Sequence, residues 1–243
     1  MIEMTYLLNS GFLVRVGRTL LVFDDFKDPA GAVDAAAAAA DFDHLYFFAS
    51  HSHFDHFDAH IQRYEAQADR YILSDDIRCM KDCSAFNPQK LTFLKPYASW
   101  KDDVLAVESF DSTDLGTSFC VTLKEEGTTI FHAGDFNWWD WTGEPAEQRK
   151  LAENAFRKQM KKLAGLEADV AFFPVDGRMG PSLDKGAKVF CAETSVRALV
   201  TMHSIGYPAW QPPAGLFSRR AARSPSGRRA SRAKRIASKT ADY

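Results

Sequence analysis

Short apolar runs separated by turn residues dominate the first fifty positions. The runs at 4–8, 12–16 and 19–23 have the length and composition of strands, with turn residues at 9–11 and 17–18 between them. The run at 44–49 is apolar almost throughout, which is typical of a strand that is buried on both faces. We therefore predict a meander of three strands followed by a central strand.

The rest of the chain mixes the two kinds of pattern. Helical composition marks the segments 35–40, 58–68, 144–164 and 183–194. Short apolar runs predict further strands at 70–73, 91–94, 105–110, 119–124, 128–132, 170–175 and 197–202. Because this order is neither a regular βαβ repeat nor all-β, we expect an α+β protein in which two stacked sheets carry helices on their outer faces.

Composition and charge divide the chain in two. With 243 residues, 46% of them hydrophobic, the chain is long enough for one domain with a large core. Residues 218–243 hold nine arginines and lysines against one acid, so the rest of the chain carries a net charge of −10 against −2 for the whole. We expect a domain at 1–217 and a basic, disordered tail at 218–243.

The tail has two interpretations. Arginine-rich tails bind phosphates without sequence specificity, so it could be a nucleic-acid-binding arm. We favour a non-functional extension, because the composition changes abruptly after Pro212-Pro213, as a change of reading frame would produce. Elsewhere the acidic charge makes nucleic acid an unfavourable partner, and we expect a small-molecule substrate.

Cysteine usage and hydropathy indicate the compartment. The four cysteines show no zinc-finger spacing, and the N-terminus lacks the pattern of a signal peptide. No stretch approaches the roughly 18 apolar residues that a membrane helix needs. We expect a cytoplasmic protein with reduced thiols and no membrane partner; the sequence does not indicate an oligomeric state.

The strongest chemical signal directly follows the central strand, in the run His51-Ser52-His53-Phe54-Asp55-His56. Side chains leaving a strand alternate, so His51 and His53 project the same way. A turn at Asp55-His56 then brings a carboxylate and a third imidazole close by. Imidazole and carboxylate are the usual ligands of zinc and related ions, so the run predicts a metal site.

This run matches the HxHxDH signature, and the chain resembles the metallo-β-lactamase superfamily over roughly residues 4–205. The strand ending in Gly134-Asp135 and the strand ending in His203 resemble that family's later metal motifs, in the expected order. The resemblance implies a four-layer αββα sandwich. It also implies a metal centre with the ligands His51, His53, Asp55, His56, Asp135 and His203.

One family residue is missing. The family usually has another histidine between the first two motifs, whereas the matching stretch 110–118 has none. Thr113 takes the usual position, with Asp111 and Asp114 nearby. Either a carboxylate substitutes, or the first ion binds weakly, or a single ion binds at Asp55, His56, Asp135 and His203; the acids could also merely cap turns.

Other residues have two interpretations each. His132 either faces the metal or is a satisfied core histidine, whereas His44 and His60 are expected to be structural or exposed. The three tryptophans of 137–141 either line a substrate pocket or plug the sandwich. Asp176 and Arg178 either orient a ligand or pair with each other.

The resemblance implies a hydrolase that uses metal-activated water on an ester, lactone or phosphodiester. Asp55 would orient the water and hold its proton, and Asp135 would ligate or bridge. The expected cofactor is zinc, as one or two ions, with manganese or iron as options. The alternatives are an iron-dependent redox enzyme of the same fold and a non-catalytic metal-binding protein. We expect fewer than two tightly held ions per chain.

Overall fold

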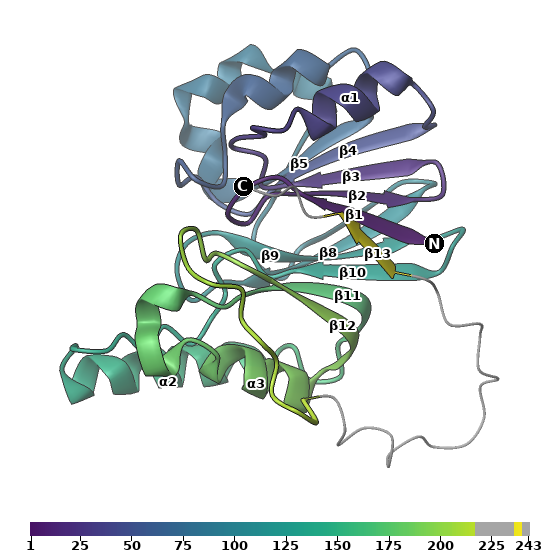
Figure 1. Cartoon of the computed structure of the whole chain (residues 1–243). Coiled ribbons are helices and arrows are strands. Elements are labelled where there is room, and N and C mark those ends of the chain that lie inside the picture. The colour runs from purple at the N-terminus through teal and green to yellow at the C-terminus, as the bar shows by residue number, and fades with distance from the viewer. Residues whose placement is uncertain (217–235, 240–243) are drawn as a thin grey trace.

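Two packed sheets form the centre of the molecule (Figure 1). The computed structural model describes residues 1–216 and the strand at 236–239. One sheet has the order β13-β1-β2-β3-β4-β5-β6 and the other β12-β11-β10-β9-β8-β7. The strands are β1 Ile2–Tyr6, β2 Phe12–Val16, β3 Thr19–Phe23, β4 His44–Ala49, β5 Arg70–Ser74, β6 Leu91–Leu94, β7 Ser99–Lys101, β8 Leu105–Asp111, β9 Thr117–Leu123, β10 Thr128–His132, β11 Glu167–Pro174, β12 Ser195–Met202 and β13 Ile236–Lys239.

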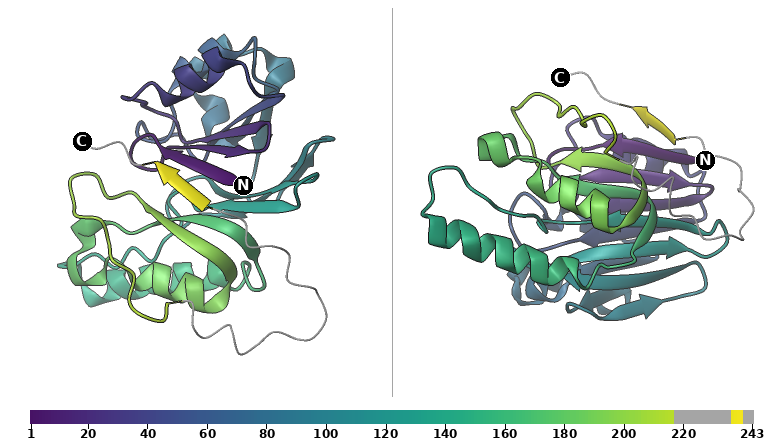
Figure 2. Two further views of the ribbon diagram at one scale, coloured as in Figure 1. Left: turned by 45° about the vertical axis from the view of Figure 1, so that its right-hand side comes forward. Right: turned by 90° about the horizontal axis from the view of Figure 1, so that it is seen from below.

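Helices cover the two outer faces. Helix α1, Ala32–Ala39, and several 3-10 helices cover the first sheet, while α2, Ala146–Met160, and α3, Lys185–Glu193, cover the second (Figures 1 and 2). The expected αββα sandwich is thereby confirmed. None of the helices among the described residues is long and apolar enough to cross a bilayer.

The strand periodicity divides the core into layers. In β4, Tyr46 and Phe48 pack into the core between the sheets, whereas Leu45 and Phe47 pack beneath α1 and the 3-10 helices. Successive side chains of a strand point to opposite faces, so a strand with a layer on each side needs apolar residues at every position. The predicted burial of this strand on both faces is confirmed.

Several boundaries differ from the sequence prediction. The segment 58–68, predicted as a helix, forms only a 3-10 helix at Ala59–Tyr64. Its two buried side chains, Ile61 and Tyr64, are three residues apart, which matches the three-residue turn of a 3-10 helix. The long helix begins at Ala146, after Pro145, and the short edge strand β7 was not predicted.

The predicted tail at 218–243 lies almost wholly outside the described residues. Within it, the strand β13 runs parallel to β1, with Ile2 opposite Ile236 (Figure 2). The predicted disorder of the tail therefore stays a prediction.

Candidate metal centre

Polar side chains from both sheets meet where the strands end. His51 follows β4, Asp135 follows β10 and His203 follows β12, while Asp114 lies between β8 and β9. Carboxyl ends of parallel strands meet at one edge of a sheet, and such edges are where α/β proteins place their sites. The site therefore depends on the packing of the two sheets, because each contributes side chains.

The first group of candidate ligands comprises His51, His53, Asp114 and Asp135. One ligand atom from each lies within 4.8 Å of the others. His51 Nε2 lies 3.0 Å from His53 Nδ1 and 3.7 Å from an Asp135 oxygen, and His53 Nδ1 lies 3.7 Å from Asp114 Oδ2. His53 and Asp114 are about half exposed, so this group faces solvent.

The second group comprises Asp55, His56 and His203, whose ligand atoms also lie within 4.8 Å of one another. Asp135 reaches this group too: its Oδ1 lies 3.2 Å from His56 Nε2 and its Oδ2 3.4 Å from His203 Nε2. Asp135 therefore stands between the two groups. All six residues that the sequence singled out as ligands come together here.

Of the three residues proposed near the place of the missing histidine, only Asp114 lies with the other candidate ligands. Thr113 donates its hydroxyl proton to the carbonyl of Asn137 at 2.6 Å, and Asp111 accepts a hydrogen bond from Gln159 at 2.7 Å. Neither belongs to the groups of candidate ligands, whereas the Asp114 carboxylate does. Of the alternatives left open by the sequence, the geometry favours a substituting carboxylate.

Two buried atoms show that the site suits a cation. His56 Nε2 and Asp135 Oδ1 are shielded from solvent and have no hydrogen-bond partner among the described residues. Leaving such an atom unsatisfied costs about 1–3 kcal/mol. A divalent ion accepts lone pairs from both an imidazole nitrogen and a carboxylate, so it would satisfy these atoms together.

Asp24, which follows β3, orients His56. Its carboxylate accepts hydrogen bonds from His56 Nδ1, from the Ser50 hydroxyl and from the Ser50 amide, each at 2.7 Å. Because Nδ1 is engaged by Asp24, Nε2, which faces Asp135, is the nitrogen of His56 that could bind an ion. Asp24 is buried with φ 44°, a left-handed conformation that is strained for a residue other than glycine.

The Asp24→Asn variant is expected to bind metal about 10–100-fold more weakly, because an amide cannot accept from all three donors. Calorimetric titration of the metal-free protein measures this. Asp25→Asn is the matched control, since Asp25 is also buried but faces His60, outside the groups of candidate ligands. Equal metal affinity in Asp24→Asn and Asp25→Asn would refute the orienting role of Asp24.

His203 is held in a similar way. Its Nδ1 lies 3.0 Å from Asp176, whose carboxylate also binds the Arg178 guanidinium. The His203 amide donates to the Asn9 carbonyl at 3.0 Å, and the Asn9 side chain donates to Asp55 at 3.0 Å. Both interpretations of Asp176 and Arg178 hold, because they pair with each other and together orient a candidate ligand.

Burial and neighbouring side chains shift the pKa values of the candidate ligands. Burial lowers the pKa of His51 to about 4. Burial also opposes a charge on His203, but hydrogen bonds to Asp135 and Asp176 outweigh it and raise the pKa of His203 to about 10. Burial would raise the pKa of Asp135, but His56 and His203 hold it well below its usual range. Asp135 is therefore ionised, as a metal-binding carboxylate must be.

The remaining histidines are structural. His132 is fully buried, donates from Nε2 to the Ser10 carbonyl at 2.8 Å, and accepts from the Gly134 amide through Nδ1 at 3.2 Å. Because both of its nitrogens are engaged, it is a satisfied core histidine. His44 and His60 pair with nearby acids and lie outside the groups of candidate ligands.

Two glycines permit the close approach of the loops. At Gly116 a Cβ would stand 2.1 Å from the Ser50 carbonyl oxygen and 2.5 Å from His51 Cβ. At Gly134 it would stand 2.7 Å from Ser50 Cβ, and both glycines have φ above +50°. Larger residues would push the loops of Asp114 and Asp135 away from His51.

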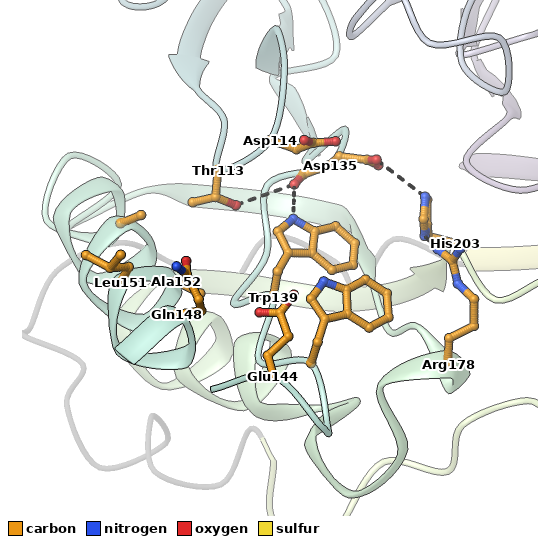
Figure 3. A pocket seen from close by; sticks show the side chains of 12 residues that line it. Thr113, Asp114, Asp135, Trp139, Glu144, Gln148, Leu151, Ala152, Arg178 and His203 are labelled. Carbon is orange, nitrogen blue, oxygen red and sulfur yellow. Dashed lines mark hydrogen bonds and ion pairs between the residues drawn. The ribbon is translucent and has the colours of Figure 1, made fainter. Parts of the chain in front are cut away.

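The tryptophans of the loop after Asp135 divide between the two interpretations. The Trp138 ring stacks on Phe156 and packs against the core. Trp139 and Trp141 stack with their centroids 5.6 Å apart and line a cavity of about 530 Å³ (Figure 3). Trp139 also donates its indole proton to the Asp135 carbonyl at 2.9 Å, which joins the wall of the cavity to the metal centre.

The sequence pattern did not single out Asp24, Asn9 or Ser50 as site residues. Only the positions of Asp24 and Ser50 could have indicated this role, because both directly follow strands, close to where the candidate ligands lie. Asn9 carried a weaker signal, since it was assigned only to a turn. Its φ of 55° is common for asparagine in turns, and only the fold brings it to Asp55.

Sequence comparison gives no relatives, since neither a family model nor a curated protein matches the chain. Solved structures do match. Igni18, described as a metallo hydrolase from Ignicoccus hospitalis, is 17% identical with a TM-score of 0.57, over 83% of this chain and 82% of its own. YhfI from Bacillus subtilis, described as a metallo-β-lactamase fold protein, is 13% identical with a TM-score of 0.53. The match covers 83% of this chain and 81% of YhfI.

A third match is CmlA from Streptomyces venezuelae, described as a diiron β-hydroxylase. It is 15% identical with a TM-score of 0.51, and the match covers 82% of this chain but 44% of CmlA. At such identities the likeness concerns the fold. Together with the paired sheets, their covering helices and the two His/Asp groups, these matches identify the chain as a protein of the metallo-β-lactamase fold.

Proposed function

We propose that the chain is a metal-dependent hydrolase of small molecules. The main support is the position of Asp135 between two groups of His/Asp ligand atoms. Its buried Oδ1 has no hydrogen-bond partner among the described residues, and neither has the neighbouring His56 Nε2. The proposed ligands are His51, His53, Asp55, His56, Asp114, Asp135 and His203.

The chemistry would take place at the open side of the two groups. With a divalent ion bound there, the pKa of a water on it would fall to about 7 and a developing oxyanion would be stabilised. We infer that Asp55, which is partly exposed and accepts a hydrogen bond from Asn9, orients that water and accepts its proton. His203 and Asp135 line the cavity, so a substrate bound there would lie beside them.

The two groups are expected to differ in affinity. His53 and Asp114 are about half exposed, whereas His56 and His203 are buried and are oriented by Asp24 and Asp176. Titration of metal-free protein with zinc is therefore expected to show a tight first ion and a second that binds at least about 10-fold more weakly. Two ions retained with equal affinity would contradict this.

The proposal is tested by loading the protein separately with zinc, manganese and iron. Hydrolysis of lactones, aryl esters and bis(4-nitrophenyl) phosphate is then followed, with the ion content measured by elemental analysis on the same samples. We expect hydrolysis of at least one class that depends on the ion. Bound metal without hydrolysis of any class would refute the hydrolase and leave a metal-binding protein.

A second candidate function is iron-dependent oxidation. Asp114 supplies a carboxylate where relatives of this fold usually have an imidazole, and such oxygen ligands suit harder ions. The likeness to CmlA is consistent with this candidate. Iron retained through purification, with a visible absorption band and no hydrolysis, would favour the oxidase.

A further inference from the structure

The cavity beside the metal centre has an apolar wall that the proposed chemistry does not use. We name its apolar part the slot, defined by Trp139, Trp141, Leu151, Ala152 and Ala155. The same cavity is lined by Asp114, Asp135 and His203, so the slot is continuous with the candidate metal centre (Figure 3). A molecule reacting at Asp135 would therefore extend into the slot.

Helix α2 contributes one regular stripe to this wall. Leu151 and Ala152 lie three and four residues after Gln148, and Ala155 lies four and three residues after them, which places all of these on one side of the helix. The helix buries other residues, Phe156 and Met160, in the core. Leu151 is 55% exposed, so an apolar side chain faces the cavity instead of the core.

The tryptophans add a flat aromatic wall. The rings of Trp139 and Trp141 are nearly parallel, at 6°, and Trp139 meets His203 edge-on with the centroids 5.6 Å apart. Small alanines and flat rings along one cavity leave room for an apolar chain or ring. The walls therefore suit an apolar group.

Away from the proposed metal ligands, the cavity offers an anion little attraction. Its other charged lining residues are Glu144 and a single arginine, Arg178. Arg178 already binds Asp176 through Nε and Nη2 and lies over the Trp141 ring. Binding a phosphodiester requires cationic side chains near its phosphate. Apart from the proposed metal site, the described lining offers only Arg178, which is already paired with Asp176.

We propose that the substrate is an uncharged ester or lactone that carries an apolar acyl or aryl group, which packs in the slot. This inference rests on the proposed hydrolase function. Water oxygen forms a bond to the carbonyl carbon, and the bond to the ester oxygen breaks. The proton taken from the water passes to the leaving oxygen, so the products are a carboxylic acid and an alcohol, joined as a hydroxy acid when the substrate is a lactone.

The test compares γ-lactones with side chains of one to eight carbons, and bis(4-nitrophenyl) phosphate, on the metal-loaded full chain. Burying a methylene is expected to raise kcat/KM by about 4-fold until the slot is filled. Ala155→Phe, which fills the slot, is expected to lower the ratio of kcat/KM for the longest and shortest lactones by about 10-fold. Leu151→Asp, which places a charge in the slot at an exposed position, is also expected to lower this ratio.

Asn154→Phe is the matched control, because Asn154 is exposed on the same helix and lies outside the cavity lining. This control is expected to keep the chain-length preference of the unchanged protein. A flat dependence on chain length, a phosphodiester preferred by 10-fold or more, or equal behaviour of Ala155→Phe and Asn154→Phe would overturn the inference and leave the hydrolase intact. Metal binding without any hydrolysis would overturn both.

Discussion

Replacing Asp135 by alanine is expected to abolish hydrolysis and to release metal from both groups of proposed ligands. The Asp135 carboxylate lies 3.2 Å from His56, 3.4 Å from His203 and 3.7 Å from His51, so no other side chain of the site reaches as many proposed ligands. Loss of a partner that only orients a ligand costs about 10–100-fold in affinity or activity, and the loss of Asp135 should exceed this. Elemental analysis and kcat/KM measure the two effects.

His56→Ala provides an independent check of the same assignment. It removes a fully buried imidazole from the second group alone, so it should lose the tighter ion and the activity. The matched control is Asp140→Ala in the loop after Asp135. Asp140 is also buried, but it binds Arg149 and Lys185 and not the proposed ligands.

Asp140→Ala should lower the melting temperature, because two cations lose a buried partner, while the protein that stays folded keeps its metal. If Asp135→Ala retained as much metal as Asp140→Ala, Asp135 would not be a ligand.

Much of the fold follows from local patterns in the sequence. The apolar run at 44–49 and the turns at 9–11 and 17–18 indicated β4 and the first meander, because burial on both faces demands an unbroken apolar strand. The short strand β7 escaped prediction, since three residues at a sheet edge carry no periodicity of their own. Pairing with β8 determines its conformation, and pairing is a tertiary property.

The site was predictable only where chemistry and strand ends coincide. The run 51–56 combines unusual residue types with a position directly after β4, so four ligands could be proposed from it. Asp24 and Asp176 were harder to assign, because an acid that ends a strand is common and only the fold shows which histidine it meets. The hydrogen bond from Asn9 to Asp55 joins residues 46 positions apart and has no local signal.

The choice among Thr113, Asp111 and Asp114 illustrates the same limit. Asp111 ends β8 and the other two lie in the loop that follows it, and their residue types alone did not rank them. The path of the loop is set by Gly116, which passes against Ser50 and His51, and by the hydrogen bond of Thr113 to Asn137. These contacts leave Asp114 facing His53. The path of such a loop depends on tertiary contacts, which form only in the folded protein and leave no local signal in the sequence.

Asp114→His is expected to convert the first group into a tighter zinc site. Asp114 completes a group with two imidazoles and Asp135, and an imidazole in its place would supply the third nitrogen ligand that zinc commonly takes. The affinity for the more weakly bound zinc ion should rise by about 10-fold or more. The preference of this group for zinc over manganese should also increase, since nitrogen ligands favour zinc over the harder ion.

Asp114→Asn is expected to act in the opposite direction, because an amide is a weak ligand that adds no charge. Competition with a chromophoric chelator measures the weaker binding step, and the absorption spectrum of bound cobalt reports the nitrogen ligands directly. Asp111→Asn is the control, as Asp111 binds Gln159 and lies outside the groups of candidate ligands. Should Asp114→Asn bind the second ion as the unchanged protein does, the carboxylate would not replace the absent histidine, and the first group would hold its ion through His51, His53 and Asp135 alone.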